Sequence, residues 1–215
     1  MKVRKITNKG PKKVIGKFPS LKMGRCIWWE SQIERDYIYL LEFDPSVTSY
    51  KEQPLCISYF LNGKEHHYTP DFLVERSNRR QIVEVKREHQ TRKEENVALF
   101  SAVGPLFFQQ GYEFIIATDT AIRVQPRLEN IKLFTRYART PIDPQHQIAC
   151  HELFAGKREV SLGEIVQFFT AKDLEIQVIY ALLYWGILAT DLMKPVELSS
   201  IVSLPQEISS AKEAS

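Results

Sequence analysis

Two short charged motifs, on stretches that the sequence predicts to be neighbouring strands, constrain this chain more than any other feature. The first is Tyr68-Thr69-Pro70-Asp71-Phe72 and the second is Glu84-Val85-Lys86, with twelve residues between Asp71 and Glu84. An apolar stretch follows Asp71, Ser77-Asn78-Arg79-Arg80 predicts a turn, and the residues leading to Lys86 alternate as a strand does. We therefore expect both motifs in one sheet.

The alternation places the charged side chains of the second motif on one face of its strand. Glu84 and Lys86 share that face with Ile82, while Val83 and Val85 point to the other. Two carboxylates and a lysine suit metal-dependent cleavage of a phosphodiester, because carboxylates hold Mg²⁺ and a lysine stabilises developing negative charge. An edge hairpin with solvated charges is the alternative that these residues alone leave open.

Length and composition fit one medium domain and a second, smaller one. The chain has 215 residues, of which 44% are hydrophobic, and this is enough to bury a core. No apolar run reaches the length of a membrane span, and residues 1–5 lack the apolar region of a secretory signal. The three cysteines are far apart and fit neither a zinc site nor a disulfide framework. We expect a cytoplasmic protein with no membrane association.

The net charge of +3 is unevenly distributed along the chain. Residues 1–29 hold no acidic residue and nine basic ones: Lys2, Arg4, Lys5, Lys9, Lys12, Lys13, Lys17, Lys22 and Arg25. This distribution predicts a basic arm that follows a nucleic-acid backbone, or alternatively a solvated tail. Residues 143–215 are net acidic, which suits a protein partner better than DNA.

Local signals predict an alternation of helices and strands. The Ser31-x-x-Glu34 pattern is typical of a helix start, and apolar spacing continues that helix to Phe43, before Asp44-Pro45. Asn62-Gly63 predicts a tight hairpin turn. The other expected elements are strands over 47–50, 55–60, 65–68 and 112–117 and helices over 91–110 and 131–138.

This order predicts an α/β fold, in which a mixed sheet is flanked by helices on both faces. We expect a basic N-terminal arm over residues 1–26, a catalytic domain over 27–140 and a small partner-binding domain over 141–215. The last would hold three helices and a β-wing, a winged-helix-like arrangement, and would end in a disordered tail from residue 206.

Five motifs in the first two thirds of the chain resemble the TnsA family in order and spacing. They are Glu30-Ser31-x-x-Glu34-Arg35-Asp36-Tyr37, Leu40-Leu41-Glu42-Phe43-Asp44-Pro45, Tyr50-x-Glu52-Gln53-Pro54-Leu55, Tyr68-Thr69-Pro70-Asp71-Phe72 and Glu84-Val85-Lys86. The resemblance covers about residues 28–120. TnsA proteins are prokaryotic, restriction-endonuclease-like subunits of heteromeric cut-and-paste transposons, including CRISPR-associated ones.

The resemblance implies a restriction-endonuclease-like core of the PD-(D/E)xK type and assigns roles to matching residues. Glu34, Asp71 and Glu84 would be catalytic and would ligate Mg²⁺, with Mn²⁺ as a substitute. The backbone carbonyl of Val85 would be a further ligand, and Lys86 would position water or stabilise the leaving oxygen. Some relatives carry Gln at the position of Glu84. For Glu34, a role as a helix-capping residue is an alternative.

The resemblance also implies the substrate and the partners. The chain would cut the 5′ strands at transposon ends in double-stranded DNA, while a TnsB-like DDE transposase cuts and joins the 3′ ends. A TnsC-like AAA+ regulator would bind the C-terminal domain. Two alternatives stay open: another nuclease of the same superfamily, such as a restriction or junction-resolving enzyme, and a non-catalytic module that bridges transposase and regulator.

Overall fold

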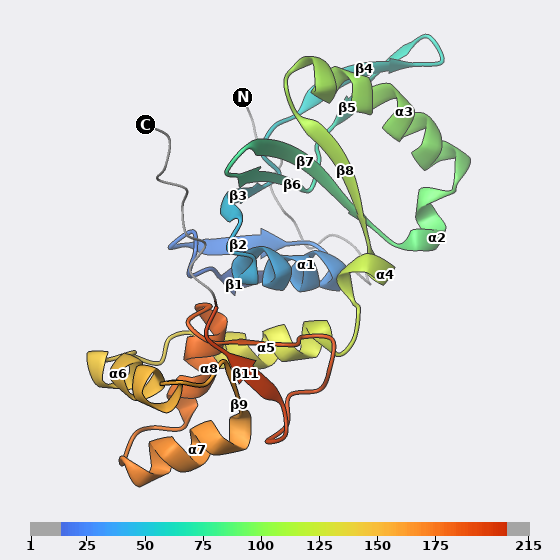
Figure 1. Ribbon diagram of the computed structural model, residues 1–215. Helices are drawn as coiled ribbons and strands as arrows, with labels where there is room; N and C mark the ends of the chain where they lie inside the picture. The colour runs from blue at the N-terminus through green and yellow to red at the C-terminus, as the bar shows by residue number, and fades with distance from the viewer. Residues whose placement is uncertain (1–13, 206–215) are drawn as a thin grey trace, which may run out of the picture. The chain divides into compact units, whose positions relative to one another are not determined.

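The computed structural model describes residues 14–205 of the chain, coloured from blue to red in Figure 1. The start of the expected basic arm and the tail expected to be disordered lie outside the described residues. The chain divides into two compact units, Met1–Val124 and Gln125–Ser215. The first unit contains all residues of the predicted catalytic set.

A mixed four-stranded sheet forms the centre of the first unit, as the sequence predicts. Its strand order is β3-β6-β7-β8, where β3 is Val47–Glu52, β6 is Phe72–Arg76, β7 is Arg79–Lys86 and β8 is Glu113–Thr118. The β3-β6 and β6-β7 pairs are antiparallel, whereas β7 and β8 are parallel. Glu84 lies on β7, inside the sheet, and is only 4% exposed. The interpretation of this segment as a solvated edge hairpin is therefore wrong.

One helix covers each face of this sheet (Figure 1). Helix α1, Gln32–Phe43, packs Ile33, Ile38 and Leu41 onto the face formed by residues such as Val83. Helix α3, Glu94–Gln109, packs its buried side chains onto the opposite face, where Ile82 lies. Neighbouring residues of β7 thus point into two separate clusters, as the predicted alternation requires.

The predicted start of α1 is confirmed. The Ser31 side chain accepts a 3.1 Å hydrogen bond from the backbone N–H of Glu34, so it satisfies one of the free donors at the helix N-terminus. The helix ends at Asp44, in extended conformation, before Pro45. Glu34 is thereby fixed in the first turn of a capped helix.

The predicted hairpin between residues 55 and 68 is also present. Strand β4, Ile57–Leu61, pairs antiparallel with β5, Lys64–Tyr68. Its turn places both Asn62 and Gly63 at positive φ, 51° and 72°, which is why an Asn-Gly pair suits the position. The last residue of β5, Tyr68, is buried and leads directly into the Pro70-Asp71 segment.

The segment 14–26, expected to be part of a loop or arm, belongs to the folded core instead. Strands β1, Gly16–Pro19, and β2, Cys26–Trp29, form an antiparallel hairpin. Phe18, Ile27 and Trp29 alternate inward and join the cluster beneath α1. Lys17 and Arg25 are exposed, whereas the Lys22 ammonium group donates to the carbonyls of Leu41 and Asp44 at the end of α1. The basic residues thus obscured the strand pattern in the sequence.

A buried carboxylate fixes the turn of this hairpin to α1. Glu42, 4% exposed, accepts hydrogen bonds from the Ser20 hydroxyl at 2.5 Å, the Leu21 N–H at 2.9 Å and the Tyr50 hydroxyl at 2.6 Å. Several donors compensate for the desolvation of this charge. The hairpin is thus held by polar contacts as well as by packing.

The predicted helix over 91–110 is confirmed as α3, which begins at Glu94. A short helix α2, Glu88–Thr91, which the sequence analysis did not predict, lies between β7 and α3. Pro105 lies inside α3 without ending it. After β8 comes α4, Asp119–Ile122, whose N-terminus is capped by the Thr118 side chain. The predicted strand over 112–117 is confirmed as β8, although it is half-buried rather than fully buried.

The second unit combines four helices with a small sheet. The helices are α5, Arg127–Tyr137, α6, Pro144–Leu153, α7, Leu162–Ala171, and α8, Gln177–Tyr184. The strands β9, Glu159–Ser161, β10, Ala189–Thr190, and β11, Ile201–Ser203, form an antiparallel sheet of order β10-β11-β9. A winged helix stays a prediction for this unit. Among residues 14–205, no helix combines the length and apolar character needed to cross a membrane.

The two units divide at residue 124, whereas the sequence analysis placed the boundary at residue 140. Helix α5 accounts for the difference, because it packs against α8 in the second unit. Its Asn130 side chain donates to the carbonyls of Leu192 and Lys194, at 2.9 and 2.7 Å. Residue 140, where the boundary was expected, instead lies between α5 and α6, inside the second unit. The assignment of partner binding to this unit stays a prediction.

Candidate active site

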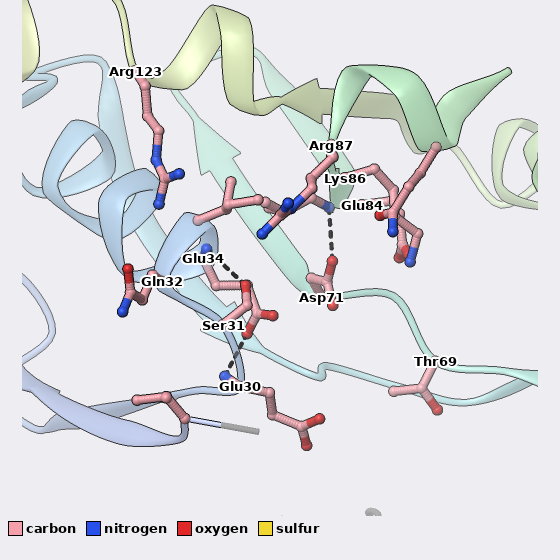
Figure 2. Close-up of a pocket in the computed structure, with 14 residues that line it drawn as sticks. Glu30, Ser31, Gln32, Glu34, Thr69, Asp71, Glu84, Lys86, Arg87 and Arg123 are labelled. Carbon is pink, nitrogen blue, oxygen red and sulfur yellow. Dashed lines mark hydrogen bonds and ion pairs between the residues drawn. The ribbon is translucent and has the colours of Figure 1, made fainter. Parts of the chain in front are cut away.

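A pocket of about 620 Å³ in the first unit brings the predicted catalytic residues together. Glu34 comes from the first turn of α1, Asp71 from the residue before β6, and Glu84, Val85 and Lys86 from the end of β7. Figure 2 shows Glu30, Ser31 and Glu34 on one side of Asp71, and Glu84 and Lys86 on the other. Residues from three separate elements thus line one cavity.

Asp71 is positioned by the backbone of the neighbouring strand. Its Oδ2 accepts a 2.7 Å hydrogen bond from the N–H of Val85, drawn as a dashed line in Figure 2. Because Asp71 precedes β6 and Val85 lies on β7, this bond forms where the two paired strands reach the pocket. The resemblance implies that the Val85 carbonyl is a metal ligand, and this role stays a prediction. The contact present here is a donation from the Val85 N–H.

Glu84 is held on both of its oxygens. Its Oε2 accepts a 2.7 Å hydrogen bond from the Tyr68 hydroxyl, and its Oε1 lies 2.5 Å from the Lys86 ammonium nitrogen. The Tyr68 ring packs against Phe107 and Phe114, which lie between α3 and the sheet. The Glu84 carboxylate is therefore oriented by Tyr68, from the aromatic cluster, and by Lys86, from its own strand.

Glu34 lies at the start of α1 and lines the pocket. Its backbone N–H is capped by Ser31, and its Oε2 accepts a 2.7 Å hydrogen bond from the N–H of Glu30. The Glu34 carboxylate thus contacts the residue before the N-cap rather than the N-cap itself. Its role as a metal ligand stays a prediction.

The clustered carboxylates perturb one another. Burial, followed by the negative charges of Glu84 and Glu34, raises the pKa of Asp71 well above its ordinary value. Burial lowers the pKa of Lys86, but the three carboxylates outweigh burial, so the net shift is upward. Lys86 is therefore protonated at neutral pH. A site with this much concentrated negative charge favours a cation.

Arginines provide positive charge around the same pocket. Arg87, directly after β7, and Arg123, after α4, both line it (Figure 2). Arg123 is fixed by a 2.7 Å ion pair from its Nε to the buried Asp36 of α1. Guanidinium groups match phosphate oxygens in geometry and charge, so this rim suits an anionic backbone next to the carboxylates.

The donor set has the chemistry of a magnesium site. Carboxylate oxygens are the ligands that Mg²⁺ prefers. Burial and the repulsion from Glu84 and Glu34 raise the pKa of Asp71, and a bound cation would relieve the repulsion. The side chains do not converge on one point, however. Among residues 14–205, no group of three or more His, Cys, Asp or Glu side chains is arranged to hold a metal ion. The oxygens of Glu84 and Glu34 instead face protein donors.

Sequence reasoning missed several residues of this pocket. Arg87, Gln90 and Arg123 line it, and Tyr68 orients Glu84 from behind it. For Tyr68 a signal was available, because it lies at the buried end of a strand immediately before Thr69-Pro70-Asp71. No local pattern marks Arg123, which reaches the pocket only through tertiary packing.

A comparison with known protein families finds a match over the part of the chain that carries Asp71, Glu84 and Lys86. Residues 44–119 match the family model described as TnsA-like endonuclease N terminal. The matched range includes Asp71, Glu84 and Lys86 and begins after Glu34. The predicted resemblance is confirmed over this range. A search of curated proteins finds no match to the chain.

Proposed function

We propose that this chain is the metal-dependent endonuclease subunit of a heteromeric transposase, because its residues 44–119 match the model of the TnsA-like endonuclease N-terminal family. Its substrate is double-stranded DNA at transposon ends, where it cleaves the 5′, non-transferred strands. The observation that carries this proposal is the gathering of Glu34, Asp71, Glu84 and Lys86 in one pocket, although they come from three elements.

Each residue of this set has a defined task in phosphodiester hydrolysis. The reaction adds water to phosphorus and breaks one phosphorus–oxygen bond. Lys86, protonated and close to Glu84, stabilises negative charge on the leaving oxygen or orients the water. Arg87 and Arg123 bind phosphates on either side of the reacting one. The Val85 N–H and the Tyr68 hydroxyl keep Asp71 and Glu84 in place.

The proposed cofactor is Mg²⁺, with Mn²⁺ as a substitute. Asp71, Glu84 and Glu34 would hold it, together with the carbonyl of Val85. When bound, the ion neutralises the phosphate and lowers the pKa of the attacking water.

The partners in this proposal are a TnsB-like DDE transposase and a TnsC-like AAA+ regulator, the latter bound by the winged-helix-like second unit. The net acidic composition of residues 143–215 supports a protein rather than DNA as the ligand of that unit. A strand-cutting enzyme without its own sequence-reading module depends on a partner to place the DNA.

A cleavage assay tests the enzymatic part of the proposal. Wild type and Asp71→Asn are each combined with the neighbouring transposase, the regulator and a transposon-end duplex in Mg²⁺. We expect wild type to cut, and both chelation of the metal and Asp71→Asn to abolish cutting while binding of the DNA persists. Equal cutting by wild type and variant would instead support the non-catalytic bridging module.

A further inference from the structure

Gln53 contacts two sides of the pocket, one that carries Asp71 and one that carries Glu30 and Glu34. It follows β3 directly and has a φ of 42°, in the left-handed region that a residue with a side chain rarely adopts. Neither the pocket lining nor the proposed chemistry includes it. Gln53 follows Glu52, which pairs with Phe72 in the sheet. It therefore lies opposite Asp71, the residue before Phe72.

The backbone of Gln53 contacts one of the predicted metal ligands. Its N–H donates a 2.8 Å hydrogen bond to the carbonyl of Asp71. The same residue, Asp71, receives the N–H of Val85 on its side chain. Asp71 is therefore fixed from both neighbouring strands, and Gln53 supplies the contact from the β3 side.

The side chain of Gln53 reaches the other wall. Its Nε2 donates a 3.1 Å hydrogen bond to Oε1 of Glu30, whose own N–H donates a 2.7 Å bond to Oε2 of Glu34. The Gln53 Oε1 is buried and accepts no hydrogen bond among the described residues. The bond to Glu30 is thus what orients this amide.

The preceding residue strengthens the same connection. Both oxygens of Glu52 accept hydrogen bonds from the Arg25 guanidinium, at 2.8 and 2.6 Å, and its Oε1 also accepts the Trp28 N–H at 3.3 Å. Glu52 thus holds β2 at the end of β3, and Gln53 holds Glu30, in the segment between β2 and α1. This is the segment that carries Glu30 and leads to Glu34.

We propose that Gln53 is a positioning residue that sets the separation between Asp71 and Glu34, two carboxylates of the proposed metal site. It does so through one continuous chain of hydrogen bonds: Asp71 carbonyl to Gln53 N–H, Gln53 amide to Glu30 carboxylate, and Glu30 N–H to Glu34 carboxylate. With its left-handed backbone, Gln53 directs its N–H to the Asp71 carbonyl and its side-chain amide to the Glu30 carboxylate. The inference rests on the function proposed above.

Three variants of the full chain separate positioning from folding. Gln53→Gly keeps the left-handed backbone and the N–H but removes the amide. Gln53→Glu keeps the shape but faces the carboxylate of Glu30 without a donor. The double variant Gln53→Glu with Glu30→Gln restores a hydrogen bond with donor and acceptor exchanged and leaves the charge of the pair unchanged. Gln109→Glu, on the exposed end of α3, is the matched control for the added charge.

Two readouts are measured on each variant: the dissociation constant for Mn²⁺ in the absence of DNA, by titration calorimetry, and the rate of 5′-strand cleavage at saturating DNA in the reconstituted reaction. We expect Gln53→Gly to weaken Mn²⁺ binding about 10- to 100-fold, as loss of a residue that orients metal ligands does. Gln53→Glu should slow cleavage by a similar factor, and the double variant should recover most of that rate. The Gln109→Glu control should match wild type in both.

Unchanged Mn²⁺ affinity in Gln53→Gly, or a slow Gln53→Glu variant that the added Glu30→Gln change does not restore, would overturn the assignment of Gln53. If Gln53→Gly fails to fold, the restoration in the double variant decides alone. A wild-type chain that binds no Mn²⁺ and cuts no DNA would instead refute the proposed function itself. The two failures are therefore distinguishable.

Discussion

The hydroxyl of Tyr68 donates a 2.7 Å hydrogen bond to the buried carboxylate of Glu84, from a ring packed against Phe107 and Phe114. Desolvation of the phenol, followed by the charge of Glu84, raises the pKa of Tyr68, so the hydroxyl remains a donor throughout the physiological pH range. The hydrophobic cluster beneath α3 thus determines where one of the pocket carboxylates lies.

Removing only this hydroxyl should impair the reaction more than the fold. Tyr68→Phe keeps the ring in its cluster, and we expect a loss of cleavage of about 10- to 100-fold, as for other residues that orient metal ligands. The measurement is the single-turnover cleavage rate alongside the melting temperature. Tyr112→Phe is the control, because its hydroxyl contacts Arg80 and its ring lies in the same cluster. Equal rates for the two variants would refute the role of Tyr68.

Lys86 should be essential for the chemical step and dispensable for DNA binding. Lys86→Met retains the length of the side chain but removes the ammonium group next to Glu84. We expect cleavage to fall by about 100- to 1,000-fold, comparable to the loss of one donor to a developing oxyanion. A gel-shift titration of the assembled complex should show unchanged affinity for the DNA. A loss of affinity without a change in the rate at saturation would assign Lys86 to binding instead.

The buried carboxylate of Glu42 should matter for stability and not for chemistry. Glu42→Gln keeps the shape but replaces one accepting oxygen by an amide group, so donors such as the Leu21 N–H lose their partner. We expect the free energy of unfolding to fall by about 1–3 kcal/mol, measured by chemical denaturation, with normal cleavage below the melting temperature. Glu95→Gln, on the exposed start of α3, should leave both unchanged.

The ion pair between Arg25 and Glu52 predicts a specific loss of stability in acid. Burial raises the pKa of Glu52, but the hydrogen bonds from Arg25 and the backbone outweigh it, so the net shift is downward. At pH values above the unfolded-state pKa, about 4.3, a lowered folded-state pKa stabilises the fold. This contribution disappears as the pH falls through the lower folded-state pKa. The free energy of unfolding of Glu52→Gln should therefore approach that of wild type as the pH falls from the unfolded-state pKa through the lowered folded-state pKa. A constant difference between the two across this range would contradict the assignment.

Much of the fold could be predicted because local and tertiary signals agree. Ser31 and Glu34 mark the start of α1, Asn62-Gly63 marks the β4-β5 turn, and the alternation around Glu84 marks β7. Asp71 and Glu84 could be located because the pairing of Phe72 with Val83 brings the residue before β6 beside Glu84. Glu34 was assigned only through the family resemblance.

The remaining features depend on tertiary contacts. The β1-β2 hairpin carries basic residues and Pro19, which conceal the inward alternation of Phe18 and Ile27. The boundary between the units follows from the packing of α5 on α8, which no local composition change marks. Arg123 reaches the pocket through its ion pair with Asp36, 87 residues earlier in the chain.

The DNA strand that this chain cuts tests the proposed function most directly. Wild type and Asp71→Ala are each reconstituted with the neighbouring transposase and regulator in Mg²⁺, and the strands at each transposon end are mapped separately. With wild type, we expect the complex to cut both strands and excise the element, whereas with Asp71→Ala the 5′ strands stay joined and cointegrates form. Identical products from both proteins would contradict the proposed function, because the pocket around Asp71 would then take no part in cleavage.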